Sequence, residues 1–233
     1  MSFGGAYRYD SQAACSSSVL ENGVMYASRF DDLLSAGILP VVAAGNDGAP
    51  ALALPACIYG AVSVGAVYDS NYGQTTYPRP SGGELCTDNT TAADKVTCFS
   101  NATTFLSILA PGAILTGVEG ELTTWGTSWA APFVTGAIAV VRGSNAIPDD
   151  VPECTRRRLV RTGAPIVDSR SGVPMTFPRL NVLAAVNTPP TVVGDCNSDL
   201  SVRINELILG ALLSKLAGIR RGEARISGRN SAG

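Results

Sequence analysis

Apolar residues in the first half of the chain recur at spacings that predict one helix and three buried strands. From Ser18 they follow helical spacing, and Gly37 supplies a C-terminal glycine cap. Residues 38–44, ILPVVAA, form a continuous apolar run that is typical of a strand covered on both faces, as in parallel sheets. Residues 61–67 and 106–110 have the same character and predict two further strands.

The N-terminal segment extends this pattern into a βαβ unit. Residues 1–5 indicate the end of a strand that runs into a glycine turn, and the polar, serine-rich residues 6–17 indicate a loop. A strand, a helix and a second buried strand in succession predict an α/β fold whose parallel sheet has helices on both faces.

The second half of the chain predicts three helices after a polar segment. Residues 69–100 are rich in Gly, Thr and Asn and form a polar excursion. Residues 127–142 are apolar nearly all round, which predicts a buried helix. Residues 152–162 suit an exposed helix whose three consecutive arginines form a solvated face, and residues 178–186 suit one short helix.

Composition and charge exclude several function classes. The 233 residues include 17 Lys and Arg against 19 Asp and Glu, so the net charge of −2 gives no electrostatic footprint for nucleic acid. No apolar run reaches the roughly 18 residues that a membrane span needs. The chain has no histidine, which excludes any acid–base pair or metal site built on histidine within this sequence.

The six cysteines are scattered, and none forms a Cys-x-x-Cys pair, which argues against a zinc site. An even number of scattered cysteines in a loop-rich chain favours disulfides and an exported protein over free buried thiols. Six cysteines allow about 15 pairings, among which we expect Cys15 with Cys57 and Cys86 with Cys98. The first residues do not form a signal peptide, so either the protein stays inside the cell or its true N-terminus lies upstream.

Three short segments carry candidate chemistry, and the first is Gly126-Thr127-Ser128 at the start of the predicted buried helix. A serine at this position is usually an N-cap. The same position suits a nucleophile, because free N–H groups and the positive end of the helix dipole lie where an oxyanion would form.

The second segment places Asn46 directly after the buried strand 38–44. In open α/β sheets, ligands bind at the carboxyl edge of the strands. A neutral amide donates a hydrogen bond without titrating, which suits an oxyanion hole, although Asn-Asp-Gly is also a strong turn sequence. The third segment, Ser2-Phe3-Gly4-Gly5, has paired glycines that allow an extended peptide to approach the backbone closely.

In this order, the three segments resemble the second half of the subtilisin-like serine proteases, the subtilases. SFGG resembles their substrate-binding strand, AAGN their oxyanion motif, and GTSWAAPFVTG their nucleophile motif, which typically reads GTSMAAPHVAG. The resemblance covers about residues 1–187 and implies a partial subtilisin-like fold whose N-terminal strands are missing.

The resemblance implies a role for each matching residue in cleaving a polypeptide substrate, with no cofactor for the catalysis. Ser128 would be the acylated nucleophile, and Asn46 would stabilise the oxyanion together with the Ser128 N–H. Ser2, Phe3 and Gly4 would pair with the substrate backbone, and Ala43, Ala44 and Gly45 would line the main specificity pocket.

The sequence departs from the family in lacking the catalytic Asp and His, which family members carry upstream of the SFGG strand. Neither an Asp-Thr-Gly nor a His-Gly-Thr motif occurs. The chain is therefore expected to be a fragment of a secreted endopeptidase, inactive as written. The alternative is a peptide-binding or scaffold module without catalysis.

A fourth segment, residues 195–206, has the spacing of an EF-hand calcium loop and resembles one dockerin repeat. Leu200 replaces the usual turn glycine and Arg203 stands at position 9, which predicts weak affinity. A turn without metal is the alternative, and a cohesin-like partner is what the resemblance implies. The expected Ca²⁺ ligands are Asp195, Asn197, Asp199, Ser201 and Glu206.

These features predict four parts of the chain. Residues 1–187 would form the partial peptidase domain, and residues 188–194, which open with Thr-Pro-Pro-Thr, a stiff linker. Residues 195–217 would form a small helical calcium-loop unit, and residues 218–233 a disordered tail.

Overall fold

The computed structural model describes residues 1–2, 4–18, 25–113, 115–116, 123–144 and 151–188. All of them belong to one compact unit, Met1–Thr188. The predicted calcium loop with its five ligands, the tail and the linker from residue 189 onward lie outside the described residues.

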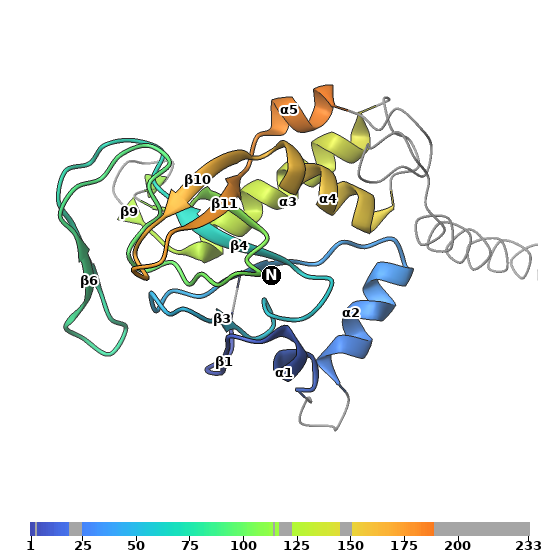
Figure 1. Ribbon diagram of the computed structural model, residues 1–233, viewed down its shortest axis with the longest axis horizontal. Coiled ribbons are helices and arrows are strands. Elements are labelled where there is room, and N and C mark those ends of the chain that lie inside the picture. The colour runs from blue at the N-terminus through green and yellow to red at the C-terminus, as the bar shows by residue number, and fades with distance from the viewer. Residues whose placement is uncertain (3, 19–24, 114, 117–122, 145–150, 189–233) are drawn as a thin grey trace, which may run out of the picture. The chain divides into compact units, whose positions relative to one another are not determined.

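A five-stranded sheet forms the centre of this unit, in the order β10-β11-β7-β4-β2 (Figure 1). The α/β class and the parallel sheet that the sequence predicts are confirmed, because β2, β4, β7 and β11 pair in parallel and only β10 runs antiparallel. The strands are β2 (Val41–Ala43), β4 (Val62–Val67), β7 (Ile108–Pro111), β10 (Ala164–Asp168) and β11 (Met175–Arg179).

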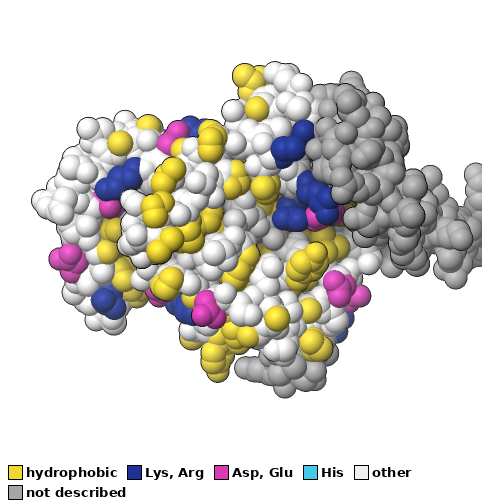
Figure 2. Space-filling view, viewed as in Figure 1, with side chains coloured by type: hydrophobic (Ala, Val, Ile, Leu, Met, Phe, Trp, Pro, Cys, Tyr) yellow, Lys and Arg dark blue, Asp and Glu magenta, His cyan; other side chains and the backbone are white. Residues whose placement is uncertain are grey.

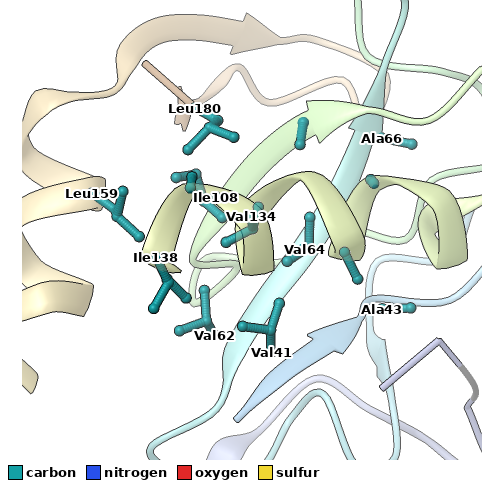
Figure 3. Close-up of a cluster of buried hydrophobic side chains, with 14 of the residues drawn as sticks. Val41, Ala43, Val62, Val64, Ala66, Ile108, Val134, Ile138, Leu159 and Leu180 are labelled. Atoms are coloured by element: carbon teal, nitrogen blue, oxygen red, sulfur yellow. The ribbon is translucent and has the colours of Figure 1, made fainter. Parts of the chain in front are cut away.

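The parallel strands β2, β4 and β7 are buried on both faces, which explains their continuous apolar sequences. Val41 and Ala43 of β2 belong to one core cluster, whereas Val42 belongs to the other. Ile108 and Leu109 of β7 divide in the same way. Figure 3 shows the first cluster, in which Val41, Val62 and Ile108 lie against the helix that crosses the sheet.

Helices cover both faces of the sheet (Figure 1). The first core cluster contains residues of α3 (Thr127–Gly143), α4 (Pro152–Thr162) and α5 (Val182–Asn187). The second contains Cys15 of α1 (Gln12–Ser16) and Phe30 of α2 (Tyr26–Ser35). No helix among the described ranges is long and apolar enough to cross a membrane.

Three predictions near the N-terminus were wrong. Residues 1–5 were expected to end a strand of the sheet, but Met1, Ser2, Gly4 and Gly5 belong to no strand. Residues 6–17 were expected to be loop, but they contain β1 (Arg8–Tyr9) and α1, whose N-cap Ser11 accepts a hydrogen bond from the Ala14 N–H. The described helix α2 begins at Tyr26 rather than at Ser18. Its predicted end is confirmed, because Gly37, at φ +78°, adopts the left-handed conformation that commonly ends helices.

The expectation of a fully buried helix at residues 127–142 was also wrong. Ala130, Val134 and Val141 of α3 are buried against the sheet, but Trp129 and Phe133 are 46% and 47% exposed. The apolar sequence of the helix gives no periodicity from which its buried face can be read.

The helix predicted at residues 152–162 is α4, but its arginines do not all face solvent. Arg156 and Arg157 form ion pairs with Glu153 at 2.6 and 2.8 Å, whereas Arg158 is only 2% exposed. Figure 2 shows dark-blue side chains gathered over this helix. The helix predicted at 178–186 begins later, because residues through Arg179 belong to β11.

Short paired strands and disulfides hold the loops. The hairpin β5–β6 lies within the polar excursion, and the two expected disulfides, Cys15–Cys57 and Cys86–Cys98, are confirmed. The short strands are β1, paired with β3 (Leu52–Ala53), β5 (Thr75–Pro78), paired with β6 (Glu84–Asp88), and β8 (Leu115–Thr116), paired with β9 (Thr123–Thr124).

Candidate active site

A pocket of about 470 Å³ lies at the carboxyl end of β2, beside the start of α3. Asn46 and Ser128 both line it, although 82 residues separate them in the sequence. The parallel sheet brings them together, because the loop after β2 and the N-terminus of α3 meet at the same edge. Gly4, Ala43 and Gly45 line the same pocket; Ala43 and Gly45 were expected to line a specificity pocket, and Gly4 to pair with the substrate backbone.

Hydrogen bonds from Thr127 fix the orientation of the Asn46 carboxamide. The Thr127 N–H and the Thr127 hydroxyl both donate to Asn46 Oδ1, each at 2.8 Å. A main-chain N–H can only donate, so the atom facing it must be the oxygen, and Nδ2 is directed away from Thr127. The Asn46 amide can therefore donate to a ligand in the pocket.

Gly126 makes room for this amide. Its φ of +136° lies in a region that L side chains rarely adopt, and a Cβ there would lie 3.0 Å from Asn46 Nδ2. A side chain at this position would be strained and would press on the Asn46 amide nitrogen.

Asn101 and Gly45 hold the loop after β2 in place. Asn101 is fully buried, and its Oδ1 accepts hydrogen bonds from the N–H groups of Asp47 and Ala49, both at 3.0 Å. A Cβ on Gly45, at φ +110°, would lie 2.4 Å from Asn101 Nδ2. The glycine therefore permits the close approach that fixes the loop carrying Asn46.

Ser128 is the second residue of α3 and is partly exposed to the pocket. Its hydroxyl donates to the main-chain carbonyl of Ser2 at 2.8 Å. The first N–H groups of a helix have no intrahelical acceptor, so the Ser128 N–H can donate to a ligand. A carbonyl oxygen is a very weak base, and this contact therefore holds the hydroxyl without activating it.

The N-terminal segment lies beside β2 and the loop before Pro55. The Ala43 N–H donates to the Met1 carbonyl at 3.1 Å, and the Gly5 N–H donates to the Leu54 carbonyl at 2.7 Å. These bonds place Gly4 and Gly5 in the pocket wall. Phe3 lies outside the described residues.

The Ala44 side chain points away from the pocket, unlike the side chain of Ala43. The side chain of Ala44 is fully buried in the second core cluster, and Ala44 is not among the residues that line the pocket. The strand alternation that directs Ala43 toward one face of the sheet directs Ala44 toward the other.

An ion pair lies in the pocket wall. Arg8 Nε contacts Asp47 Oδ2 at 2.6 Å, and this hydrogen bond holds the pKa of the Asp47 carboxyl below its ordinary value. A carboxylate with a lowered pKa is a poor proton acceptor, so Asp47 does not replace the missing base. The described residues contain no group of three or more His, Cys, Asp or Glu side chains that could hold a metal ion.

Sequence reasoning missed several residues of this site. Thr127 lies between two residues of the nucleophile motif, but its bond to Asn46 depends on the fold. Asn101 and Arg79 come from segments distant in sequence, and no local pattern indicates them. The residues that were missed are Arg8, Asp47, Arg79, Asn101, Trp125 and Thr127.

Comparison with known proteins finds one protein family whose profile matches this chain and several solved structures with a similar fold. The profile of the subtilase family matches residues 1–181. The patellamide maturation protease PatA is 25% identical over 69% of this chain and 54% of its own, with a TM-score of 0.50. A protease from Pseudoalteromonas arctica PAMC 21717 is 20% identical over 80% of this chain and 49% of its own, with a TM-score of 0.51. The chain thus spans about half the length of these structures, and no curated protein matches it.

Proposed function

This chain belongs to the subtilase family, and we propose that it carries the nucleophile and the oxyanion-stabilising half of a site that hydrolyses peptide bonds. Ser128 is the proposed nucleophile. The Asn46 carboxamide and the Ser128 N–H are the proposed donors to the oxyanion. The polypeptide substrate would lie against Ser2, Phe3 and Gly4, with one side chain in the pocket.

In the proposed reaction, Ser128 Oγ bonds to the carbonyl carbon of the scissile peptide while its proton passes to a base. The carbonyl π electrons move onto oxygen, and the oxyanion accepts hydrogen bonds from Asn46 Nδ2 and the Ser128 N–H. Collapse of this intermediate breaks the C–N bond, and the leaving amine takes the proton from the base. Water then hydrolyses the Ser128 ester by the same steps.

The base is the part of this reaction that the sequence does not supply. There is no histidine in the 233 residues, and the Ser128 hydroxyl donates to the Ser2 carbonyl, which cannot take its proton. The family's catalytic Asp and His would have to come from polypeptide outside this sequence. We therefore expect no turnover from the chain by itself.

The observation that carries the proposal is the fixed orientation of Asn46. Two hydrogen bonds from Thr127 hold its oxygen and leave its N–H₂ free of Thr127, and Asn46 lines the same pocket as Ser128. An ordinary turn asparagine does not need to be locked in this way, whereas an oxyanion donor does, because preorganisation is what makes it effective.

The test is fluorophosphonate labelling of the chain fused behind a subtilase segment that supplies the catalytic Asp and His. We expect one adduct, located on Ser128 by mass spectrometry of the digested protein, and none in S128A. An adduct on another serine, or a folded and unlabelled fusion, would contradict the assignment. Circular dichroism of both proteins verifies folding.

One observation favours a second function, peptide binding without catalysis. The nucleophile's hydroxyl is already bonded within the chain, and no described group is placed to deprotonate it. This alternative predicts that the chain alone binds peptides in the pocket and that S128A binds them equally well, while the fusion protein remains unlabelled.

We also propose that the protein is exported. Disulfides form and persist in oxidising compartments, and the Cys15–Cys57 and Cys86–Cys98 bonds support this assignment. Thiol labelling of protein taken from the native host, before and after reduction, tests it. Free thiols at these four positions before reduction would contradict export.

A further inference from the structure

The hairpin β5–β6 supplies one wall of the candidate active site. Arg79, Ser81 and Leu85, from the hairpin, line the same pocket as Asn46 and Ser128. None of them belongs to the segments that resemble subtilase motifs. The hairpin can therefore act on substrate selection without taking part in the chemistry.

Aromatic packing joins this hairpin to the nucleophile segment. The ring of Tyr77 on β5 meets the rings of Trp125 and Phe99 edge-on, with centroid distances of 4.9 and 4.7 Å. Trp125 lies three residues before Ser128. The position of the hairpin is thereby fixed relative to the nucleophile, as a specificity element requires.

Two further bonds fix the base of the hairpin. The disulfide Cys86–Cys98 joins β6 to the loop before Phe99. The Tyr77 hydroxyl donates to Tyr68, whose hydroxyl donates to Asp88 on β6, each at 2.9 Å. Burial raises the pKa of Tyr77 to about 12, so this hydroxyl remains a neutral donor at physiological pH.

The turn of the hairpin holds the Arg79 side chain in place. The Arg79 N–H donates to the Gly83 carbonyl at 2.8 Å, and Arg79 Nε donates to the Glu84 carbonyl at 3.0 Å. Nε is used in this geometry, and the two Nη groups remain for a ligand. Together, the two Nη groups can bind a carboxylate through two parallel hydrogen bonds.

The charges in the pocket wall do not cancel. The charged lining residues are Arg8, Asp47 and Arg79. Arg8 and Asp47 form an ion pair at 2.6 Å, whereas no carboxylate of the described chain lies within ion-pair distance of Arg79. Among the described residues, the wall therefore carries one positive charge more than it has negative charges.

We propose that Arg79 makes this pocket selective for polypeptides that carry an acidic side chain, Asp or Glu, at the position that reaches the hairpin wall. The inference rests on the proposed function insofar as the pocket must receive a polypeptide. The acidic side chain would accept hydrogen bonds from the two Nη groups of Arg79. An amide of the same shape would form weaker bonds and gain nothing from the charge.

Binding of fluorescein-labelled peptides to the full chain tests this inference without requiring catalysis. In a set of peptides, one Glu is moved along an Ala and Ser background, and each is paired with a peptide carrying Gln at the same position. Fluorescence anisotropy should show one position at which Glu binds about five-fold more tightly than Gln, the upper range for an exposed ion pair. That preference should weaken with added salt.

Variants at Arg79 and at a matched control arginine complete the test. R79Q should abolish the preference, and R79E should transfer it to a Lys peptide. R29Q, which removes an exposed arginine of α2 outside the pocket, should leave it unchanged. Equal binding of the Glu and Gln peptides, or an equal loss in R29Q, would overturn the proposal.

The outcomes separate this inference from the proposed function. If R79Q abolishes a measured preference while the fusion protein remains unlabelled by fluorophosphonate, the acidic selectivity stands and the proposed catalysis fails. If Ser128 is labelled and no preference for Glu is found, the catalysis stands and the selectivity fails. If no peptide binds at all, both the selectivity and the peptide site are contradicted.

Discussion

Asn46 and Thr127, 81 residues apart in the sequence, are joined by two hydrogen bonds of 2.8 Å to a single oxygen, Asn46 Oδ1. A third bond completes the arrangement, because the Gly45 N–H donates to Thr127 Oγ1 at 3.1 Å. The loop after β2 and the start of α3 are thereby held as one unit. The proposed oxyanion donor and the proposed nucleophile keep a fixed spacing as a result.

Replacing Thr127 by valine tests this relationship. Thr127 is 1% exposed, and T127V keeps its shape while removing the hydroxyl that bonds to Asn46 and Gly45. We expect a loss of about 1–3 kcal/mol in the free energy of unfolding, because the Gly45 N–H loses its acceptor and Asn46 Oδ1 keeps only the main-chain N–H of residue 127. Urea unfolding measures this loss.

T127S serves as the matched control, since it keeps the hydroxyl. In the fusion protein, T127S should be phosphonylated at nearly the wild-type rate and T127V more slowly. Equal rates in both variants would show that the Thr127 hydroxyl does not position Asn46.

The two disulfides should differ in their contribution to stability. Cys15–Cys57 joins residues 42 positions apart, and Cys86–Cys98 joins residues 12 apart. Closing the longer loop removes more entropy from the unfolded chain. Replacing both cysteines by alanine should therefore lower the free energy of unfolding by about 4 kcal/mol for Cys15–Cys57 and by about 3 kcal/mol for Cys86–Cys98. Urea unfolding of both variants without reductant tests the order, and a larger loss from the shorter loop would contradict it.

The ion pair between Asp168 and Arg170 should make the free energy of unfolding depend on pH. Burial opposes ionisation of Asp168, but the hydrogen bonds and charge of Arg170 outweigh it, so the pKa of the carboxyl lies below its ordinary value. Arg170 binds both carboxylate oxygens, at 2.9 and 2.7 Å. It also donates to the carbonyls of Thr97 and Ser100, next to Asn101 of the site.

A carboxyl whose pKa is lowered by folding stabilises the protein above its unfolded pKa of about 4. That stabilisation is lost as the pH falls through the lower pKa of the folded state. D168N should lose about 3 kcal/mol at pH near 7, because it removes one partner of a buried pair. It should also show a smaller further loss between pH near 7 and pH near 3 than the wild type.

Urea unfolding at both pH values measures this difference. D32N serves as the control, because the Arg29–Asp32 pair is exposed and should contribute little. Identical acid sensitivity in the wild type and D168N would contradict the role of the ion pair.

Local sequence patterns were sufficient to predict the strands β2, β4 and β7 of the sheet, but not β10 and β11. The strands were recognisable because burial on both faces demands an unbroken apolar run, as in residues 38–44. Asn46 follows a strand and Ser128 begins a helix, but these positions alone also suit a turn residue and an N-cap, so the proposed roles of the two residues came from the resemblance to the subtilase motifs. Where these residues meet is a consequence of the parallel pairing of β2, β4 and β7, which the unbroken apolar runs predict.

Features that depend on tertiary contacts could not be predicted. Helix α3 is apolar all round, so its sequence does not indicate that Trp129 would face away from the sheet. The five-residue helix α1 has too little periodicity to be recognised, and it is held by its Ser11 cap and by the Cys15 disulfide. Asn101 and Arg79 reach the site from segments whose sequences are ordinary for loops and turns.

The central claim is that Asn46 and Ser128 act on the same reacting group, and N46D tests it most directly. The substitution keeps an oxygen for Thr127 to bond and replaces the N–H₂ donor by an oxygen that repels an oxyanion. The measurement is the rate of fluorophosphonate addition to Ser128 in the fusion protein that supplies the catalytic Asp and His. The account predicts that N46D lowers this rate by about 10²–10³ with the fold unchanged, whereas an unchanged rate in folded N46D would contradict it.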